Sequence, residues 1–143
     1  MGLPETQLNR LKRLKNTAAG IVTCKKKIDS VNILDELHWL PVRDRITFKL
    51  MLLIFKALNG LGPKYLSELL IPYAPERTLR SQDQLLLQTP RSRLKTAGDR
   101  AFSVAGPKLW NTLPYDVRAS KTLSQFKTKL KTHLFSQAKR TIS

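Results

Sequence analysis

The chain has 143 residues, of which 26 are Lys or Arg and 10 are Asp or Glu, giving a formal charge of +16 at pH 7. Hydrophobic residues make up 41% and charged residues 25%, which is typical of folded domains and excludes the composition of a wholly disordered chain. The length excludes a second large domain, and the charge favours a polyanionic partner such as nucleic acid.

The first half of the chain predicts helices. Apolar residues recur at helical spacing over Glu5–Val22, with most basic residues on the other side, so we expect a basic amphipathic helix there. A short helix is expected between Asp29 and Pro41, because the residue before a proline is pushed out of the helical region. Pro41 also suits the first turn of a third helix, which ends at Asn59 with Gly60 as its left-handed terminator.

The third helix carries the predicted core. Its middle, Leu50–Phe55, is apolar on every side, so we expect other helices to pack around it. On this basis Leu53→Ala is expected to lower the free energy of unfolding by about 2–5 kcal/mol. A fourth helix is expected to start at Gly62 and to be closed by Pro72.

Residues 75–100 form a predicted basic arm. Two short runs within and beside it, Gln84–Thr89 and Arg100–Val104, are candidate strands of a hairpin, with coil as the alternative. A helical turn follows from Gly106 and is broken by Pro114. The predicted fold class is therefore mainly α: a small helical domain over residues 1–136 with a short β-hairpin or coil arm.

The last predicted helix begins after Thr122, a residue type that caps helix N-termini. Its narrow apolar stripe consists of Leu123, Phe126, Leu130 and Leu134. We expect this stripe to contribute less to stability than the middle of the third helix. Residues 137–143 are expected to form a frayed basic tail.

The residues needed for catalysis or metal binding do not gather in this sequence. The possible soft metal ligands are too few for a structural zinc site, being Cys24, His38 and His133. No Gly-x-Ser-x-Gly turn or phosphate-binding glycine loop is present. Asp35 and Glu36 are adjacent and point about 100° apart on a helix, and Asp44, between two arginines, is interpreted as a local ion pair. We therefore predict no catalytic residues, metal or cofactor, and a protein that is not an enzyme.

Cysteine content and hydropathy limit the cellular compartments in which the protein is expected. Cys24 is the single cysteine, so no disulfide can form within the chain, which favours a reducing compartment. We interpret Cys24 as a small buried hydrophobic residue. The apolar run Leu50–Phe55 is too short to cross a bilayer, and residues 1–13 lack the apolar stretch of a signal peptide. We expect an intracellular protein, nuclear or cytoplasmic, without a membrane partner.

Basic residues carry the positive signal. Three clusters are candidate phosphate-binding sites for RNA or DNA: Lys25, Lys26 and Lys27; Arg91, Arg93, Lys95 and Arg100; and Lys127, Lys129 and Lys131. For any one cluster a solvated face is an equal alternative. Trp39 and Trp110 each lie beside a Leu-Pro corner, which favours core packing over stacking on bases.

A series of short motifs carries a resemblance to a known family. The motifs include Leu37-His38-Trp39-Leu40-Pro41-Val42-Arg43, Phe55-Lys56-Ala57-Leu58-Asn59-Gly60, Pro90-Arg91-Ser92-Arg93, Asp99-Arg100-Ala101-Phe102 and Pro107-Lys108-Leu109-Trp110-Asn111. Over about residues 2–135 the chain resembles the C-terminal tail that follows the reverse transcriptase in LINE-type, non-LTR retrotransposon polyproteins.

The resemblance implies binding rather than catalysis. The parent polyproteins carry a polymerase with a Tyr-Ala-Asp-Asp metal site, and this chain lacks that tetrapeptide. The resemblance implies a tail that helps to hold RNA or target DNA, with other parts of a retrotransposon polyprotein as possible partners. The expected function is thus that of a non-enzymatic nucleic-acid-binding remnant or domesticated tail. Two alternatives stay open: a helical protein-interaction module that docks through the Leu123–Leu134 stripe, and a translated relic without selected function.

Overall fold

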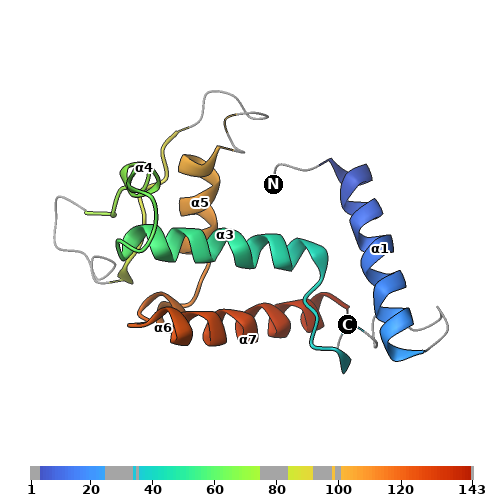
Figure 1. The fold of residues 1–143 in the computed structure, drawn as a ribbon. Coiled ribbons are helices and arrows are strands. Elements are labelled where there is room, and N and C mark those ends of the chain that lie inside the picture. Colours follow the sequence, from blue (N-terminus) through green and yellow to red (C-terminus); the bar gives the residue numbers. More distant parts are fainter. Residues whose placement is uncertain are drawn as a thin grey trace. The chain divides into compact units, whose positions relative to one another are not determined.

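A computed structural model describes residues 4–24, 34, 36–74, 84–91, 98 and 101–142. This part of the chain is mainly helical, which confirms the predicted fold class (Figure 1). Its helices are α1 (Glu5–Thr23), α3 (Val42–Leu58), α4 (Lys64–Glu68), α5 (Phe102–Asn111), α6 (Tyr115–Arg118) and α7 (Leu123–Ile142).

The chain divides into two compact units. Residues 48–131 form one, here called the central unit, and residues 2–47 with 132–143 form the other, here called the terminal unit. The boundary falls inside α3, after Thr47, and inside α7, after Lys131. A single domain over residues 1–136 stays a prediction.

Three aromatic rings form the centre of the central unit. Phe55 on α3 stacks on Phe126 on α7, with ring centroids 4.3 Å apart. Trp110 on α5 lies against the same Phe126 ring, at 5.8 Å. Gly106 on α5 lies against α3, since a Cβ atom at this position would be in ordinary contact with Ile54 Cδ1, at 3.4 Å. The core therefore joins α3, α5 and α7.

The predicted centre of the core is partly wrong. Met51, Leu52, Ile54 and Phe55 are buried, but Leu53 leaves 44% of its surface exposed. Leu53 is on the side of α3 that faces solvent, because a helix packed on its neighbours keeps one side exposed. The burial on which the expected cost of Leu53→Ala rested is therefore wrong.

The Leu123–Leu134 stripe is also more central than predicted. Phe126 and Leu130 are 0% exposed and Leu134 is 3% exposed. These three residues are therefore already covered within the fold and leave no free apolar face for docking another chain. Their burial is as complete as that of Ile54 and Phe55, which does not support a smaller contribution of the stripe to stability.

The helix ends follow the sequence signals. Gly60 has φ +67°, and the Leu61 N–H donates to Lys56 O at 2.8 Å, which is the left-handed termination predicted there. The Arg45 N–H donates to Pro41 O at 2.9 Å, so Pro41 leads directly into α3. The Gln125 N–H donates to Thr122 Oγ1 at 3.2 Å, and this capping bond confirms Thr122 as the start of α7.

The predicted arm contains no strand within its described residues. Leu87 forms an isolated antiparallel bridge with Pro72. The side chain of Asn111 also holds the backbone of Leu87, an arrangement here called the clasp. The Asn111 NH2 group donates to Leu87 O at 2.8 Å, and Asn111 Oδ1 accepts from Leu87 N–H at 2.9 Å. The candidate strand at Arg100–Val104 is wrong, because α5 begins at Phe102 and buries Val104. A run of five residues is too short to distinguish the 3.6-residue period of a helix from the 2-residue period of a strand.

Other boundaries also shift. Pro107, predicted in a first turn, lies inside α5, and α7 continues through Gln137, where we expected its end to fray, to Ile142. Of the short helix predicted before Pro41, Leu34 and Glu36 are helical, whereas residues 37–40 are described and are not helical. The other residues of that prediction lie outside the described part of the chain. Cys24 is exposed, so its interpretation as a buried residue is wrong. It caps the C-terminus of α1 in a left-handed conformation with φ 54°.

Candidate nucleic-acid interface

Six of the predicted phosphate-binding residues lie outside the described part of the chain: Lys25, Lys26, Lys27, Arg93, Lys95 and Arg100. Arg91 is described and exposed. The remaining three, Lys127, Lys129 and Lys131, are on α7 in the central unit. What the structure says about the predicted interface therefore concerns Arg91 and this last cluster.

The structure separates the three lysines of α7. Lys127 and Lys131 are exposed and, being four residues apart, lie on the same side of the helix. Lys129 is two residues from each and points about 200° away from them. Its ammonium donates to both the carboxylate and the backbone carbonyl oxygen of Asp116, each at 3.0 Å. Two of the three predicted lysines thus share a face, and the third is engaged within the fold.

Arg118, at the start of the basic C-terminal segment, is part of the core rather than of the surface. It is buried, and its Nη1 donates to Leu113 O at 2.7 Å and to Asn111 O at 3.2 Å. Burial lowers the pKa of this guanidinium. Arg118 therefore links α6 to the end of α5 and is not placed to meet a phosphate.

Exposed basic residues are spread over the central unit. Besides Arg91, Lys127 and Lys131 they include Lys49, Lys64, Lys108 and Lys121. The acidic residues described in this unit are Glu68 and Asp116, and Asp116 is taken by Lys129. These cations do not form a cluster in the sequence, because they are far apart along the chain, and the sequence therefore did not single them out as candidates.

The two tryptophans have different environments. Trp110 is 2% exposed, and its indole N–H donates to Leu85 O at 2.9 Å, which confirms its predicted place in the core. Trp39 is half-buried and lines a cavity of about 690 Å³ in the terminal unit. Sequence reasoning had grouped the two residues together.

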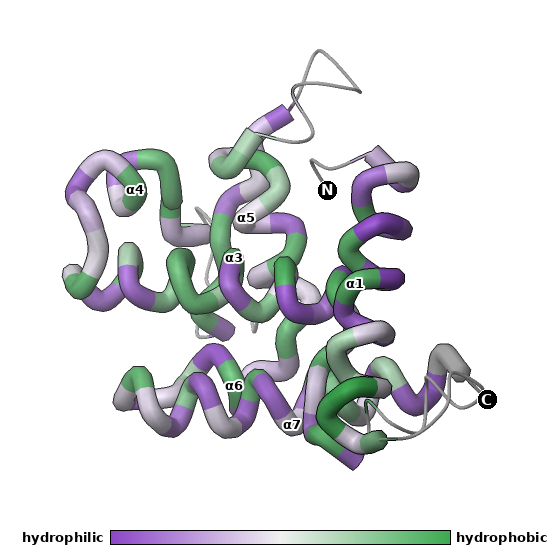
Figure 2. Tube along the Cα trace, turned by 45° about the vertical axis from the view of Figure 1, so that its right-hand side comes forward, coloured by the Kyte–Doolittle hydropathy of each residue, from purple (hydrophilic) through white to green (hydrophobic). Residues whose placement is uncertain are grey.

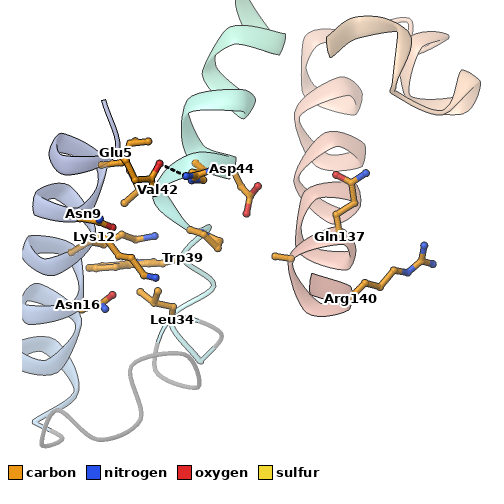
Figure 3. A pocket seen from close by; sticks show the side chains of 15 residues that line it. Glu5, Asn9, Lys12, Asn16, Leu34, Trp39, Val42, Asp44, Gln137 and Arg140 are labelled. Atoms are coloured by element: carbon orange, nitrogen blue, oxygen red, sulfur yellow. Dashed lines mark hydrogen bonds and ion pairs between the residues drawn. The ribbon is translucent and has the colours of Figure 1, made fainter. Parts of the chain in front are cut away.

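The cavity is built from α1, the corner before α3, the start of α3 and the end of α7. Leu8, Leu34 and Trp39 supply apolar walls, while Asn9, Lys12, Lys15 and Asn16 come from one face of α1. Figure 3 shows Lys12, Asn16 and Trp39 together between α1 and the segment leading to α3, whereas Arg140 on α7 extends away from them. Its volume and mixed lining are those of a small-molecule site.

Charges in the cavity are partly matched. The Arg43 guanidinium donates to the Glu5 carboxylate, and the Lys15 ammonium donates to Leu40 O. Burial, and next the charge of Arg45, lower the pKa of Lys15. Burial raises the pKa of Asp44, against the opposite effect of Lys15. Arg43, one of the two arginines beside Asp44, therefore pairs with Glu5. In this respect the local ion pair predicted at Asp44 is wrong.

The sides of α1 that do not line the cavity carry large apolar residues beside Arg10 and Arg13. Leu11, Leu14, Ile21 and Val22 are all exposed, and Figure 2 shows hydrophobic and hydrophilic residues alternating along this helix. Within α1 the cavity is lined mainly by polar residues, Asn9, Lys12, Lys15 and Asn16 among them, while the large apolar residues named above are exposed.

The described residues contain neither a candidate metal site nor a candidate membrane-spanning helix. No group of three or more His, Cys, Asp or Glu side chains within ranges 4–24, 34, 36–74, 84–91, 98 and 101–140 is placed to hold a metal ion. In the same part of the chain, no helix combines the length and apolarity that a bilayer crossing requires. No known family, curated protein or solved structure matches this chain.

Proposed function

We propose that this protein binds RNA or DNA through the phosphate backbone and catalyses no reaction. The observation that carries the proposal is the excess of exposed cations on the central unit, where the described acidic residues are Glu68 and Asp116. When these cations contact the phosphates of a nucleic acid, the counterions condensed on the nucleic acid are released, and this release favours binding.

Lys127 and Lys131 are the residues that we assign to backbone contact. They are exposed on one side of α7 and about 6 Å apart along the helix axis, so both ammonium groups can meet one strand. A phosphate contact carries no base information, so binding is expected to be indifferent to sequence. Arg91 and the basic residues outside the described part of the chain are further candidates.

The resemblance extends the proposal to origin. The ordered motifs from Leu37 to Leu113 support a remnant or domesticated tail of a LINE-type polyprotein. Other parts of such a polyprotein are the corresponding candidate protein partners. A translated relic without selected function would retain the charge but need not retain the arrangement of Lys127 and Lys131.

The test uses labelled oligonucleotides of equal length: single-stranded RNA, single-stranded DNA and duplex DNA. Affinity is measured by fluorescence anisotropy for the native chain, for the double variant Lys127→Gln/Lys131→Gln, and for Lys129→Gln. A single strand releases about 0.7 counterions per contact and a duplex about 0.9. At roughly 0.15 M salt, losing two contacts is therefore expected to weaken binding about fifteenfold for the single strands and about thirtyfold for the duplex.

Lys129→Gln is the matched control, because it removes one charge from the same helix but from a side chain that already serves Asp116. We expect it to weaken binding of the single strands by less than the roughly fourfold that the loss of one phosphate contact would cause. Equal affinity of the double variant and the native chain would remove this face of α7 from the interface. Absence of binding to every oligonucleotide would refute the proposal.

The apolar face of α1 favours a second candidate, a helical protein-interaction module. Leu14 and Ile21 leave 69% and 73% of their surfaces exposed, so they are available to a partner. Arg10 and Arg13 border this face, so a partner that fits it presents acidic side chains beside apolar ones. Leu14→Gln/Ile21→Gln is expected to abolish such binding and to leave nucleic-acid binding unchanged.

A further inference from the structure

We propose that the cavity of the terminal unit takes one unpaired nucleotide of a single strand, with its base against Trp39 and its phosphate at Lys12. This inference rests on the proposed function and names a site for a base, which backbone contact alone does not require. Trp39, Lys12 and Asn16 line the same cavity of about 690 Å³, and Figure 3 shows them together.

Trp39 is the stacking surface. Its indole is half-buried at the cavity wall, and among the described residues its ring N–H has no hydrogen-bond partner. Trp110, by contrast, is fully packed and donates to Leu85 O. A partly exposed aromatic side chain that lines a cavity suits a nucleobase, because every base can stack on an aromatic ring.

Asn16 supplies the hydrogen-bonding edge. Its Oδ1 is buried and has no partner in the described part of the chain, an arrangement that costs free energy. The terminal torsion of asparagine is soft, so a small rotation turns this oxygen towards the cavity. Exocyclic amino groups and ring N–H groups of bases are the donors that such an oxygen accepts. Asn9, one turn earlier on the same face of α1, offers a second amide.

The charge of the cavity selects an anionic ligand. Glu5 is neutralised by Arg43, and Lys15 is held by Leu40 O beside Asp44. Lys12 is exposed at the cavity rim and has no ion pair within the described ranges. A ligand that stacks on Trp39 and carries a phosphate near Lys12 therefore satisfies both features. The volume is that of a small-molecule site, so a base reaches it only when it is unpaired.

The test reads binding and stacking separately. Three probes are used: a single-stranded oligonucleotide, an abasic oligonucleotide of the same length, and adenosine monophosphate. Anisotropy of labelled strands reports binding, and tryptophan fluorescence reports stacking, with the Trp39→Phe variant isolating the signal of Trp110. We expect both strands to bind, but only the base-bearing strand to quench Trp39 saturably. Adenosine monophosphate should quench Trp39 at concentrations at least a hundredfold higher, since one phosphate releases few counterions.

Lys12→Gln and Arg10→Gln form a matched pair on α1. Each removes one cation, but Arg10 is two residues away and faces about 200° from Lys12. Lys12→Gln should raise the strand concentration that half-quenches Trp39 by about fourfold, one lost contact at ~0.15 M salt. Arg10→Gln should change it by less than twofold. This pair decides the question even if Trp39→Phe fails to fold, which circular dichroism would reveal.

The outcomes separate the two proposals. If neither strand binds, the proposed function fails. If both strands bind and Trp39 is not quenched, backbone binding stands and the nucleotide site is refuted. The site is also refuted if Trp39→Phe retains the full quenching, or if Lys12→Gln and Arg10→Gln behave alike. Saturation by adenosine monophosphate at the same concentration as the strand would refute the single-strand assignment in favour of a free nucleotide.

Discussion

Phe55 and Phe126 stack with their ring centroids 4.3 Å apart and their planes 18° from parallel. The two residues come from α3 and α7, and both are buried. An aromatic pair of this kind adds about 0.5–1.5 kcal/mol beyond the burial of its area. This contact fixes the pairing of the two long helices within the central unit.

Phe126→Ala is expected to lower the free energy of unfolding by about 3–5 kcal/mol, since it removes a fully buried ring and leaves a cavity. Leu53→Ala, on the exposed side of α3, should lower it by about 1 kcal/mol or less. Urea denaturation of the two variants checks the ranking. A larger loss for Leu53→Ala would contradict the packing of α3 on α7.

Asn111→Ala tests the clasp on Leu87. The asparagine amide both donates to and accepts from the backbone of Leu87, which is buried. Its removal leaves two backbone groups without partners, at about 1–3 kcal/mol for each unsatisfied group. Thr112→Ala, at the next and exposed position, is the control. Hydrogen exchange of the Leu87 amide should speed up in Asn111→Ala alone, and equal protection in both variants would count against the clasp.

His133 predicts a pH dependence of stability. Burial, and then the charge of Arg140, hold the pKa of this imidazole below its ordinary value. Below about pH 6.5 the unfolded chain therefore binds more protons than the folded one. Stability contributed by this group is present above pH 6.5 and is lost as pH falls through the folded pKa.

The measurement is the thermal midpoint of the native chain and of His133→Gln between about pH 5 and pH 7. As pH rises, the thermal midpoint of the native chain should increase relative to that of the variant, because glutamine does not titrate. Parallel curves would show that His133 titrates alike in the folded and unfolded states.

Local signals in the sequence predicted the helix ends well. Gly60 and Thr122 act through backbone geometry within a few residues, so the sequence alone contains the information. The extent of α5 was missed, because Phe102–Asn111 contains Gly106 and Pro107, which disfavour a helix interior when considered without their packing. Both residues are buried in α5, and tertiary packing of this kind, which the sequence does not contain, commonly overrides local helix propensity.

The candidate site depended on distances that the sequence does not contain. Lys127, Lys129 and Lys131 form one cluster in the sequence, and only the position of Asp116, thirteen residues earlier, removes Lys129 from it. The cavity beside Trp39 joins α1 to the end of α7, and these segments are at opposite ends of the chain. Helical spacing in the sequence did indicate a polar face on α1. That face supplies most of the residues of α1 that line the cavity, so this part of the cavity could be inferred from the sequence.

The salt dependence of binding tests backbone recognition most directly. With about five phosphate contacts, the logarithm of affinity should fall against the logarithm of salt concentration with a slope near −3.5 for a single strand and near −4.5 for a duplex. Lys127→Gln/Lys131→Gln should flatten the single-strand slope by about 1.4, because two contacts are lost. A slope near zero for the native chain, at measurable affinity, would contradict the claim that this protein binds nucleic acid through its phosphates.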